Sequence, residues 1–284
     1  MKATTSWEIA LLTRFLVLIS VGLLGFVAYV VLIGSVRHDR SQDLLYAQVR
    51  EQLAAIEMPT GGVIEPGTAV AVLEIPGLGL NEVVVEGTSG TQLVDGPGHL
   101  RTSPLPGQQG VAVLMGRAVT FGGPFRNIAA LREGDEVVAT TGQGRFTYRV
   151  DGVRRDGDPV PPPMAAGGGR IMLASAEGAD LYGLPLSPDR TVFVDATLIG
   201  RAVSAAADGP ISLLPEEIPL KRDESGLVPL VLWLQALLLV VVGFAWARLR
   251  WGRLETWFVG TPVVLAACWQ VFSWAAVVAL PNLV

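Results

Sequence analysis

Three long apolar runs and one region of short alternating runs divide this chain of 284 residues. The first apolar run, 15–34, has twenty residues without a charge, the length that an α-helix needs to cross a bilayer. Two more runs, 227–247 and 256–280, lie beyond the alternating region at 69–201. The pattern therefore predicts three transmembrane helices, one before and two after a β-rich domain.

A secretory signal peptide is the competing interpretation of residues 15–34. Its apolar core would be shorter, and an Ala-x-Ala-like cleavage site would follow it, which is not found here. A membrane anchor is therefore favoured. Residues 35–68 then combine a stalk helix, whose apolar face includes Leu45, Val49 and Leu53, with a linker rich in proline and glycine.

Short apolar runs separated by glycine, proline and aspartate turns fill the region 69–201. Seven runs are visible, at residues 69–75, 82–87, 110–115, 135–140, 144–153, 170–175 and 191–200. This is an all-β pattern at barrel-like spacing, in which 128–131 is the best candidate for a single helical turn. A polar, proline-containing linker, 202–226, leads to the second apolar run.

The short loop 248–255 determines the expected orientation in the membrane. It contains three arginines, and short positively charged loops stay in the cytoplasm. Residues 1–14 would then be cytoplasmic as well, while the β-rich domain and an external tail, 281–284, would lie outside. The sequence therefore predicts a multi-pass protein of the cell membrane with one extracytoplasmic domain.

Polar and aromatic residues in the last two apolar runs suggest contacts within the bilayer. Gln235 and Gln270 lie in the middle of these runs, where an amide side chain requires a hydrogen-bond partner. They could bond each other or a partner membrane protein. Tryptophans near the ends of the runs are typical of anchors at the membrane surface.

Composition and charge exclude several classes of function. The net charge is −5 without a basic patch, so no nucleic-acid partner is predicted. Cys268, in the third apolar run, is the only cysteine, which excludes an internal disulfide and a cysteine-based metal cluster. The glycine-rich stretches 120–125 and 165–170 lack the lysine and the strand-to-helix setting of phosphate loops. No cofactor and no metal are expected.

Several motifs in the β-rich domain occur in a recognisable order. They are IPGLGL at 75–80, GPGHLRTSPLPG at 96–107, VAVLMGRAVTFGGPF at 111–125, IMLASA at 171–176 and DRTVFVDATLIG at 189–200. In this order and at these distances they resemble the sortases, above all the actinobacterial, class E-like type with a GPGH segment. The resemblance covers residues 69–201. It implies an all-β, sortase-like closed barrel of about eight strands and a thiol transpeptidase that joins sorting-signal proteins to the cell wall or to pili.

The chemistry that the resemblance implies needs a cysteine nucleophile, a histidine that transfers a proton and an arginine that stabilises the oxyanion. By the same resemblance, Arg117 stands in the place of the histidine, Ala176 in that of the cysteine, and Arg190 keeps that of the arginine. A methyl group cannot attack a carbonyl, and a guanidinium with a pKa above about 12 cannot act as a general base near neutral pH. The sequence therefore predicts a degenerate member without catalytic activity.

The two arginines are also candidates for ligand binding. Arg117 and Arg190 would face each other across the cleft, and two cations there require an anion nearby. Glu177 and Asp180 are the internal candidates, which would give a closed, salt-bridged cleft. Alternatively, Arg117, Arg190 and Glu177 form a site that receives the carboxylate of a partner peptide.

Ser175 and His99 offer a weaker route to catalysis. Ser175 precedes Ala176, but successive strand residues face opposite sides of a sheet, so Ser175 should point away from the cleft. His99 lies in the GPGH segment, outside the three catalytic positions that the resemblance implies. A structural serine and a turn histidine are therefore favoured over a catalytic pair.

The favoured interpretation is a membrane-anchored, extracytoplasmic pseudosortase. It would bind a sorting-signal-like peptide or surface protein, or act as a scaffold in a complex of the cell envelope. Two alternatives stay open. The domain could still process surface proteins with an unusual nucleophile, or the barrel could be a spacer while the three spans carry the function through a partner of the last two.

Overall fold

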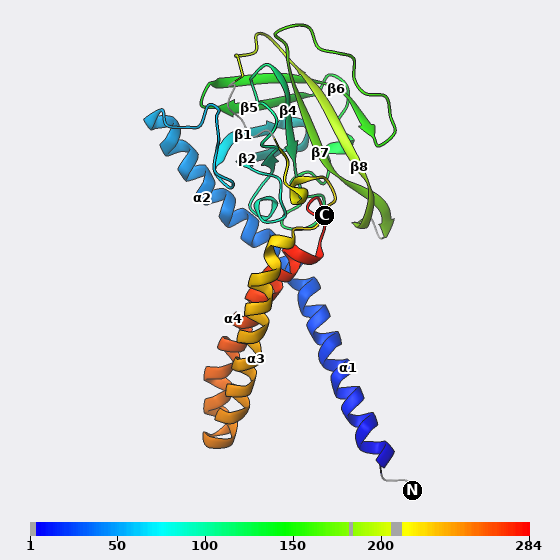
Figure 1. Ribbon diagram of the computed structural model, residues 1–284, viewed down its shortest axis with the longest axis vertical. Helices are drawn as coiled ribbons and strands as arrows, with labels where there is room; N and C mark the ends of the chain where they lie inside the picture. Colours follow the sequence, from blue (N-terminus) through cyan, green and yellow to red (C-terminus); the bar gives the residue numbers. More distant parts are fainter. Residues whose placement is uncertain (1–3, 182–183, 206–211) are drawn as a thin grey trace.

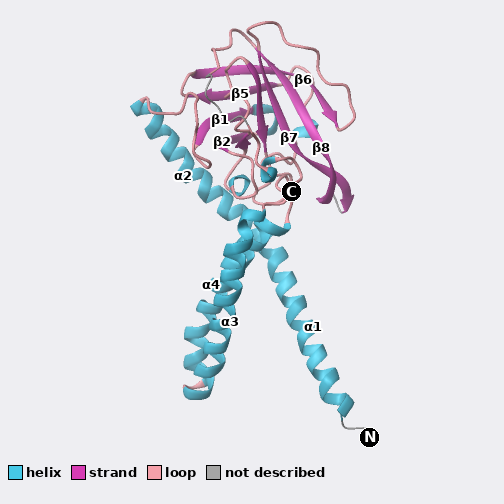
Figure 2. Ribbon diagram, viewed as in Figure 1, coloured by secondary structure: helices cyan, strands magenta, loops and turns pink. Residues whose placement is uncertain are grey.

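The computed structural model describes residues 4–181, 184–205 and 212–284. A closed β-barrel lies at one end of the molecule, and long helices extend from one side of it (Figure 1). Figure 2 shows that strands and loops make up most of the barrel end, with α2 beside them, whereas helices dominate the other end. The predicted combination of one β-domain with apolar helices before and after it is confirmed.

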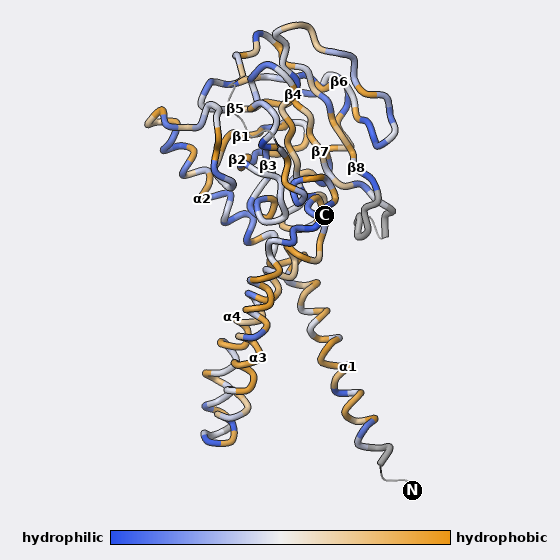
Figure 3. The backbone as a smooth tube through the Cα atoms, viewed as in Figure 1, coloured by the Kyte–Doolittle hydropathy of each residue, from blue (hydrophilic) through white to orange (hydrophobic). Residues whose placement is uncertain are grey.

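Within the described residues, three helices are long and apolar enough to cross a membrane. The first is one continuous helix made of α1 (Thr4–Ala28), the π-helical turn η1 (Tyr29–Ile33) and α2 (Gly34–Ala55). The second is α3 (Leu227–Arg250), and the third is α4 (Arg253–Ala279). Hydrophobic residues cover α1, α3 and α4, whereas polar residues interrupt α2 where it lies along the barrel (Figure 3). The expected stalk is therefore not a separate helix, because the π-helical turn η1 leads directly into α2.

The loop 248–255 is shorter than predicted. The helix α3 continues to Arg250 and α4 begins at Arg253, which leaves only Trp251 and Gly252 between them. Arginines in the last turn of a helix are favourable because they lie at the negative end of the helix dipole. The helix α3 therefore continues past the predicted hydrophobic run, 227–247, and includes Arg248 and Arg250 in its last turn.

Within the described chain, eight strands close the barrel in the order β1-β2-β3-β4-β7-β8-β6-β5. Their bounds are β1 Ala69–Ile75, β2 Leu80–Glu86, β3 Gly98–His99, β4 Gly110–Met115, β5 Glu136–Thr141, β6 Gly144–Arg155, β7 Gly169–Leu181 and β8 Leu184–Leu198. All but β3 correspond to apolar runs in the sequence. The expected helical turn is also present, as a 3-10 turn at Ile128–Ala130.

The strand β7 connects the parts of the barrel that carry the candidate residues. It pairs in parallel with β4, so that Ala174 lies opposite Met115, near the end of β4. On its other edge β7 pairs antiparallel with β8, where Ala176 lies opposite Thr191 and Glu177 opposite Arg190. The end of β4 and the middle of β8 thus both lie beside the same part of β7.

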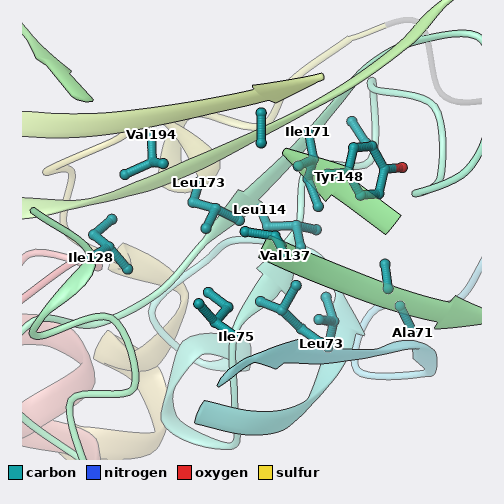
Figure 4. Close-up of a cluster of buried hydrophobic side chains, with 14 of the residues drawn as sticks. Ala71, Leu73, Ile75, Leu114, Ile128, Val137, Tyr148, Ile171, Leu173 and Val194 are labelled. Carbon is teal, nitrogen blue, oxygen red and sulfur yellow. The ribbon is translucent and has the colours of Figure 1, made fainter. Parts of the chain in front are cut away.

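Alternation along β7 decides which side chains fill the barrel. Ile171 and Leu173 belong to the interior core, whereas Ala174 and Ala176 belong to a second buried cluster. Figure 4 shows interior side chains from several strands that point toward one another, among them Leu73, Leu114, Val137, Tyr148 and Val194. Burial of each large apolar side chain contributes about 1.5–3 kcal/mol, so this core holds β4 and β7 in place.

Residues 281–284, predicted to lie outside the membrane and here called the tail, pack against the rest of the molecule. Asn282, Leu283 and Val284 are buried. Figure 1 shows the end of the chain at the base of the barrel, after α4 has returned to it. The tail therefore contributes to the packing of the barrel.

Candidate functional site

Arg117 lies two residues after β4 and is completely buried. Its Nε donates to Leu93 O (3.2 Å), Nη1 donates to Thr120 Oγ1 (3.1 Å) and Val284 O (3.0 Å), and Nη2 donates to Gly90 O (3.0 Å). The guanidinium carbon is 5.1 Å from the centre of the Phe121 ring. A buried cation is costly unless its donors are satisfied, and here oxygen acceptors surround it.

The protonation state of Arg117 follows from these surroundings. The pKa of Arg117 is lowered to about 9, mainly by burial and also by the like charge of Arg37, whereas Asp223 opposes the shift. The guanidinium is therefore still protonated at neutral pH. A general acid or base needs a pKa near the pH at which it works, so Arg117 is poorly suited to proton transfer.

The tail fills the space beside Arg117. Leu283 O accepts a hydrogen bond from the Ala118 N–H (2.9 Å), and its side chain belongs to the same buried cluster as Ala176. Asn282 Nδ2 donates to Thr88 O and Ile218 O, each at 3.0 Å. Residues of the chain itself thus occupy the space next to the end of β4.

A cavity of about 460 Å³ also adjoins Ala176. Among the described residues, its lining includes three arginines, Arg126, Arg155 and Arg190, and one carboxylate, that of Glu177. Electrostatics therefore favours an anionic occupant over a cationic one.

Glu177 neutralises part of this positive charge. Its Oε1 accepts a hydrogen bond from Arg155 Nη2 at 2.8 Å. The hydrogen bond from Arg155 holds the pKa of Glu177 below its usual value, and the charge of Arg190 acts in the same direction. Arg126 donates to Val119 O (3.2 Å). Glu177 is thus paired with Arg155 across two strands of the cavity wall.

The structure places Arg117 and Arg190 in different surroundings. Arg190 lines the cavity together with Glu177 and Ala176, and its side chain is exposed. Arg117 instead contacts carbonyls of the tail and of the loop after β2. Glu177 pairs with an arginine that the sequence did not single out, and the side chain of Asp180 lies outside the described residues.

Ser175 faces away from the cavity, as its strand position predicted. Its side chain is fully buried, and Oγ donates to Gly116 O at 2.9 Å. His99 is part of a different cluster, so the two residues do not form a pair. Within the described residues, no group of at least three His, Cys, Asp or Glu side chains could hold a metal ion.

His99 belongs to a buried polar cluster that the sequence did not reveal. Its Nδ1 is 2.7 Å from Glu86 Oε2, and its Nε2 is 3.0 Å from Ser103 Oγ. Ser103 Oγ is also bonded to two backbone groups of neighbouring strands and turns. These contacts hold the short strand β3 between β2 and β4. Glu86 and Ser103 carry no local pattern that would have linked them to His99.

The barrel has relatives among known proteins. Residues 73–164 match the family described as Sortase domain. Sortase D of Bacillus subtilis is 36% identical over 86 residues, which is 30% of this chain and 42% of that protein. The chain belongs to the sortase family. Sortase SrtE1 of Streptomyces coelicolor is 34% identical over 96 residues, 31% of this chain and 27% of that protein.

Solved sortase structures are similar to the barrel as well. Sortase E from Streptomyces avermitilis is 32% identical, and the similarity covers 48% of this chain and 91% of that one with a TM-score of 0.39. A sortase D5 transpeptidase from Clostridium perfringens is 21% identical, with 58% and 100% covered and a TM-score of 0.45.

The similarity to the sortases covers only part of the proteins compared. This chain spans less than half the length of the two curated sortases that it matches. The family match ends before β7, so Ala176 and Arg190 lie outside it, as do α3 and α4. The correspondence of Ala176 and Arg190 with catalytic positions therefore depends on the sequence motifs alone.

Proposed function

We propose that this sortase-family protein is a membrane-anchored, non-catalytic protein whose extracytoplasmic barrel binds an acidic peptide or protein segment. The main support for the proposal comes from Arg117 and Ala176 and their surroundings. The motifs place Arg117 where sortases have a histidine and Ala176 where they have a cysteine. Arg117 is buried, protonated and bonded to oxygen acceptors. A methyl group cannot form an acyl intermediate, so thiol transpeptidation has neither its nucleophile nor its proton donor.

The charge of the cavity beside Ala176 supports binding as the role of the barrel. Its arginines outnumber its carboxylates, and Arg155 and Glu177 satisfy each other. A peptide carboxylate would be attracted by the arginines that line the cavity. Guanidinium groups bind carboxylates through two parallel hydrogen bonds, which gives direction as well as affinity to such a contact.

The docked tail supports a scaffolding role for the same protein. The barrel is connected to the α3 and α4 helices through the linker before α3 and again through the tail after α4. Two connections restrict rotation of the barrel relative to the helices more than one does. A peptide held in the cavity would therefore be presented in a defined orientation to other proteins of the envelope.

Peptide binding to the full-length protein in nanodiscs tests the proposal. We expect acidic peptides to bind, and analogues with Asn and Gln in place of Asp and Glu to bind weakly. Arg190→Gln should reduce affinity for the acidic peptide about tenfold, whereas Arg201→Gln, at an exposed arginine away from the cavity, should leave it unchanged. Glu177→Gln should increase affinity because it removes the competing carboxylate. Equal binding of acidic and neutral peptides would contradict the proposal.

A turnover assay tests the absence of catalysis separately. The full-length protein is incubated with LPXTG-like and LAXTG-like peptides and an amine acceptor, and products are followed by mass spectrometry. We expect neither cleavage nor transfer. A product whose formation is abolished by Ser175→Ala would support an enzyme with an unusual nucleophile instead.

A further inference from the structure

A second cavity, of about 330 Å³, lies where the barrel meets the helices. Three separate parts of the chain line it: Arg37 of α2, Thr91 in the loop after β2, and Trp269, Gln270, Ser273 and Trp274 of α4. Figure 1 shows the junction of α1 and α2 next to α4, just below the barrel. This cavity is distinct from the one beside Ala176, with which it shares no lining residue.

The helical walls of this cavity are held together by direct contacts. Tyr29, in the π-helical turn η1, places its hydroxyl 2.6 Å from Ser273 Oγ, and its ring is 5.4 Å from that of Trp269. The ring of Phe272 also lies 6.0 Å from that of Tyr29. Single π-helical turns are frequent at functional sites. Because Tyr29 and Ser273 satisfy each other, the shape of the cavity does not depend on an occupant.

Arg37 gives the cavity a positive charge, and the nearby carboxylate of Asp223 accepts hydrogen bonds from Thr91. In the part of the chain that the structure describes, the guanidinium of Arg37 is in none of the ion pairs. It is close enough to the buried Arg117 for its charge to lower the pKa of that residue. Two neighbouring cations at the edge of apolar helices favour an anion beside them.

The lining of the cavity combines charged, polar and aromatic side chains. Arg37 and Thr91 form a polar end next to the barrel, and α4 descends about 12 Å from Val277 to Trp269. Tryptophan side chains are typical of the boundary between headgroups and acyl chains. A molecule that fits has an anionic group at one end and apolar chains at the other, which is the form of an anionic phospholipid.

We propose that the cavity between α2 and α4 binds the headgroup of an anionic phospholipid, and that Arg37 binds its phosphate. This inference depends on the proposed insertion of α1 and α4 in the membrane, but not on peptide binding by the barrel. Bound lipid would fill the space under the loop after β2 and so hold the barrel at a fixed height above the membrane.

Lipid binding to the full-length protein tests the proposal. The protein is released from mixed micelles and its complexes with phosphatidylglycerol and phosphatidylcholine are quantified by native mass spectrometry. We expect phosphatidylglycerol to bind more tightly, and Arg37→Gln to weaken it about fivefold. Arg37→Lys should retain part of the preference because it keeps the charge. Arg50→Gln, at an exposed arginine further along α2, should behave as the unmodified protein.

Three outcomes would overturn the proposal. One is equal binding of the two lipids, and another is unchanged phosphatidylglycerol binding by Arg37→Gln. The third is displacement of the lipid by excess inorganic phosphate, which would identify a site for a free anion. Reconstitution of each variant into nanodiscs is measured in parallel. Normal reconstitution of the unmodified protein without a preference for phosphatidylglycerol rejects the lipid site alone, whereas failed reconstitution of the unmodified protein rejects the membrane placement.

Discussion

Arg117 is a charged side chain that serves as a structural element of a protein interior. Its acceptors come from the loop after β2, from its own turn and from the tail, so one guanidinium connects three segments. A guanidinium has five N–H donors in one plane, which suits acceptors that converge from different directions. A lysine ammonium offers only three donors from a single point and cannot reach all of these oxygens.

We therefore expect Arg117→Leu to reduce the free energy of unfolding by about 3–5 kcal/mol, the usual cost of breaking a buried charged network. The substitution leaves the carbonyls of Gly90, Leu93 and Val284 without their donor. Chemical denaturation of the full-length protein in detergent measures the change. Arg117→Lys keeps a charge and some donors, so its loss should be smaller. If Arg117→Leu were as stable as the unmodified protein, the network would not contribute to stability.

At the scale of secondary-structure elements, the linker before α3 is fixed to the barrel by two acidic residues. Asp223 Oδ2 accepts hydrogen bonds from the N–H of Thr91 (3.1 Å) and from its Oγ1 (2.8 Å). Glu217 forms an ion pair with Arg101 of the barrel, with Oε1 2.6 Å from Nε. The described residues 212–226 of the linker are therefore attached to the barrel, and α3 begins from a fixed point.

The hydrogen bonds of Asp223 predict a dependence of stability on pH. Burial raises the pKa of Asp223, but hydrogen bonds from Ser225 and Thr91 outweigh this, so the pKa is lower than usual. A carboxyl with a lower pKa in the folded state contributes stability above its unfolded pKa of about 3.9. That contribution is lost as the pH falls through the folded pKa.

Thermal unfolding at a series of pH values tests this contribution. We expect Asp223→Ala to unfold at a lower temperature than the unmodified protein at neutral pH. The difference should shrink below about pH 4 because both proteins then lack the carboxylate. Asp135→Ala, at a carboxylate in an exposed turn of the barrel, is the matched control. A difference that does not change with pH would show that Asp223 does not act through its charge.

The sequence predicts most of these elements but few of the contacts between them. Apolar runs with turn residues between them are a local signal, and they locate seven strands and all three apolar helices. The strand β3 has only two residues, which is too short for an alternating hydrophobic pattern. Arg117 and Val284 are 167 positions apart, and no local pattern connects them. The cavity arginines Arg126 and Arg155 were missed for the same reason, since the fold alone brings them to Arg190.

For the whole molecule, the tail is one of the contacts that join the last helix to the barrel. We expect Leu283→Asp to release it, because a carboxylate cannot be accommodated in the apolar cluster that contains Ala174 and Ala176. The Ala118 N–H, which donates to Leu283 O, should then exchange with solvent about 10-fold faster or more. Hydrogen–deuterium exchange measures this in the full-length protein.

The matched control for the tail is Leu214→Asp, which places the same charge at an exposed leucine of the linker. It should leave exchange at Ala118 unchanged. If Leu283→Asp also left exchange there unchanged, the tail would not protect the barrel. Faster exchange throughout the barrel in Leu283→Asp would instead indicate that the tail is needed for the stability of the whole domain.

The orientation of the molecule in the membrane follows from its charge distribution and is the broadest prediction. Arg248, Arg250 and Arg253 surround the short turn between α3 and α4, and such a turn stays in the cytoplasm. In a Cys268→Ser background, a membrane-impermeant maleimide should label Val160→Cys, in an exposed loop of the barrel, on intact cells. It should label Trp251→Cys only after the membrane is permeabilised. The reverse labelling would place the barrel in the cytoplasm, where it could not meet a partner of the cell envelope.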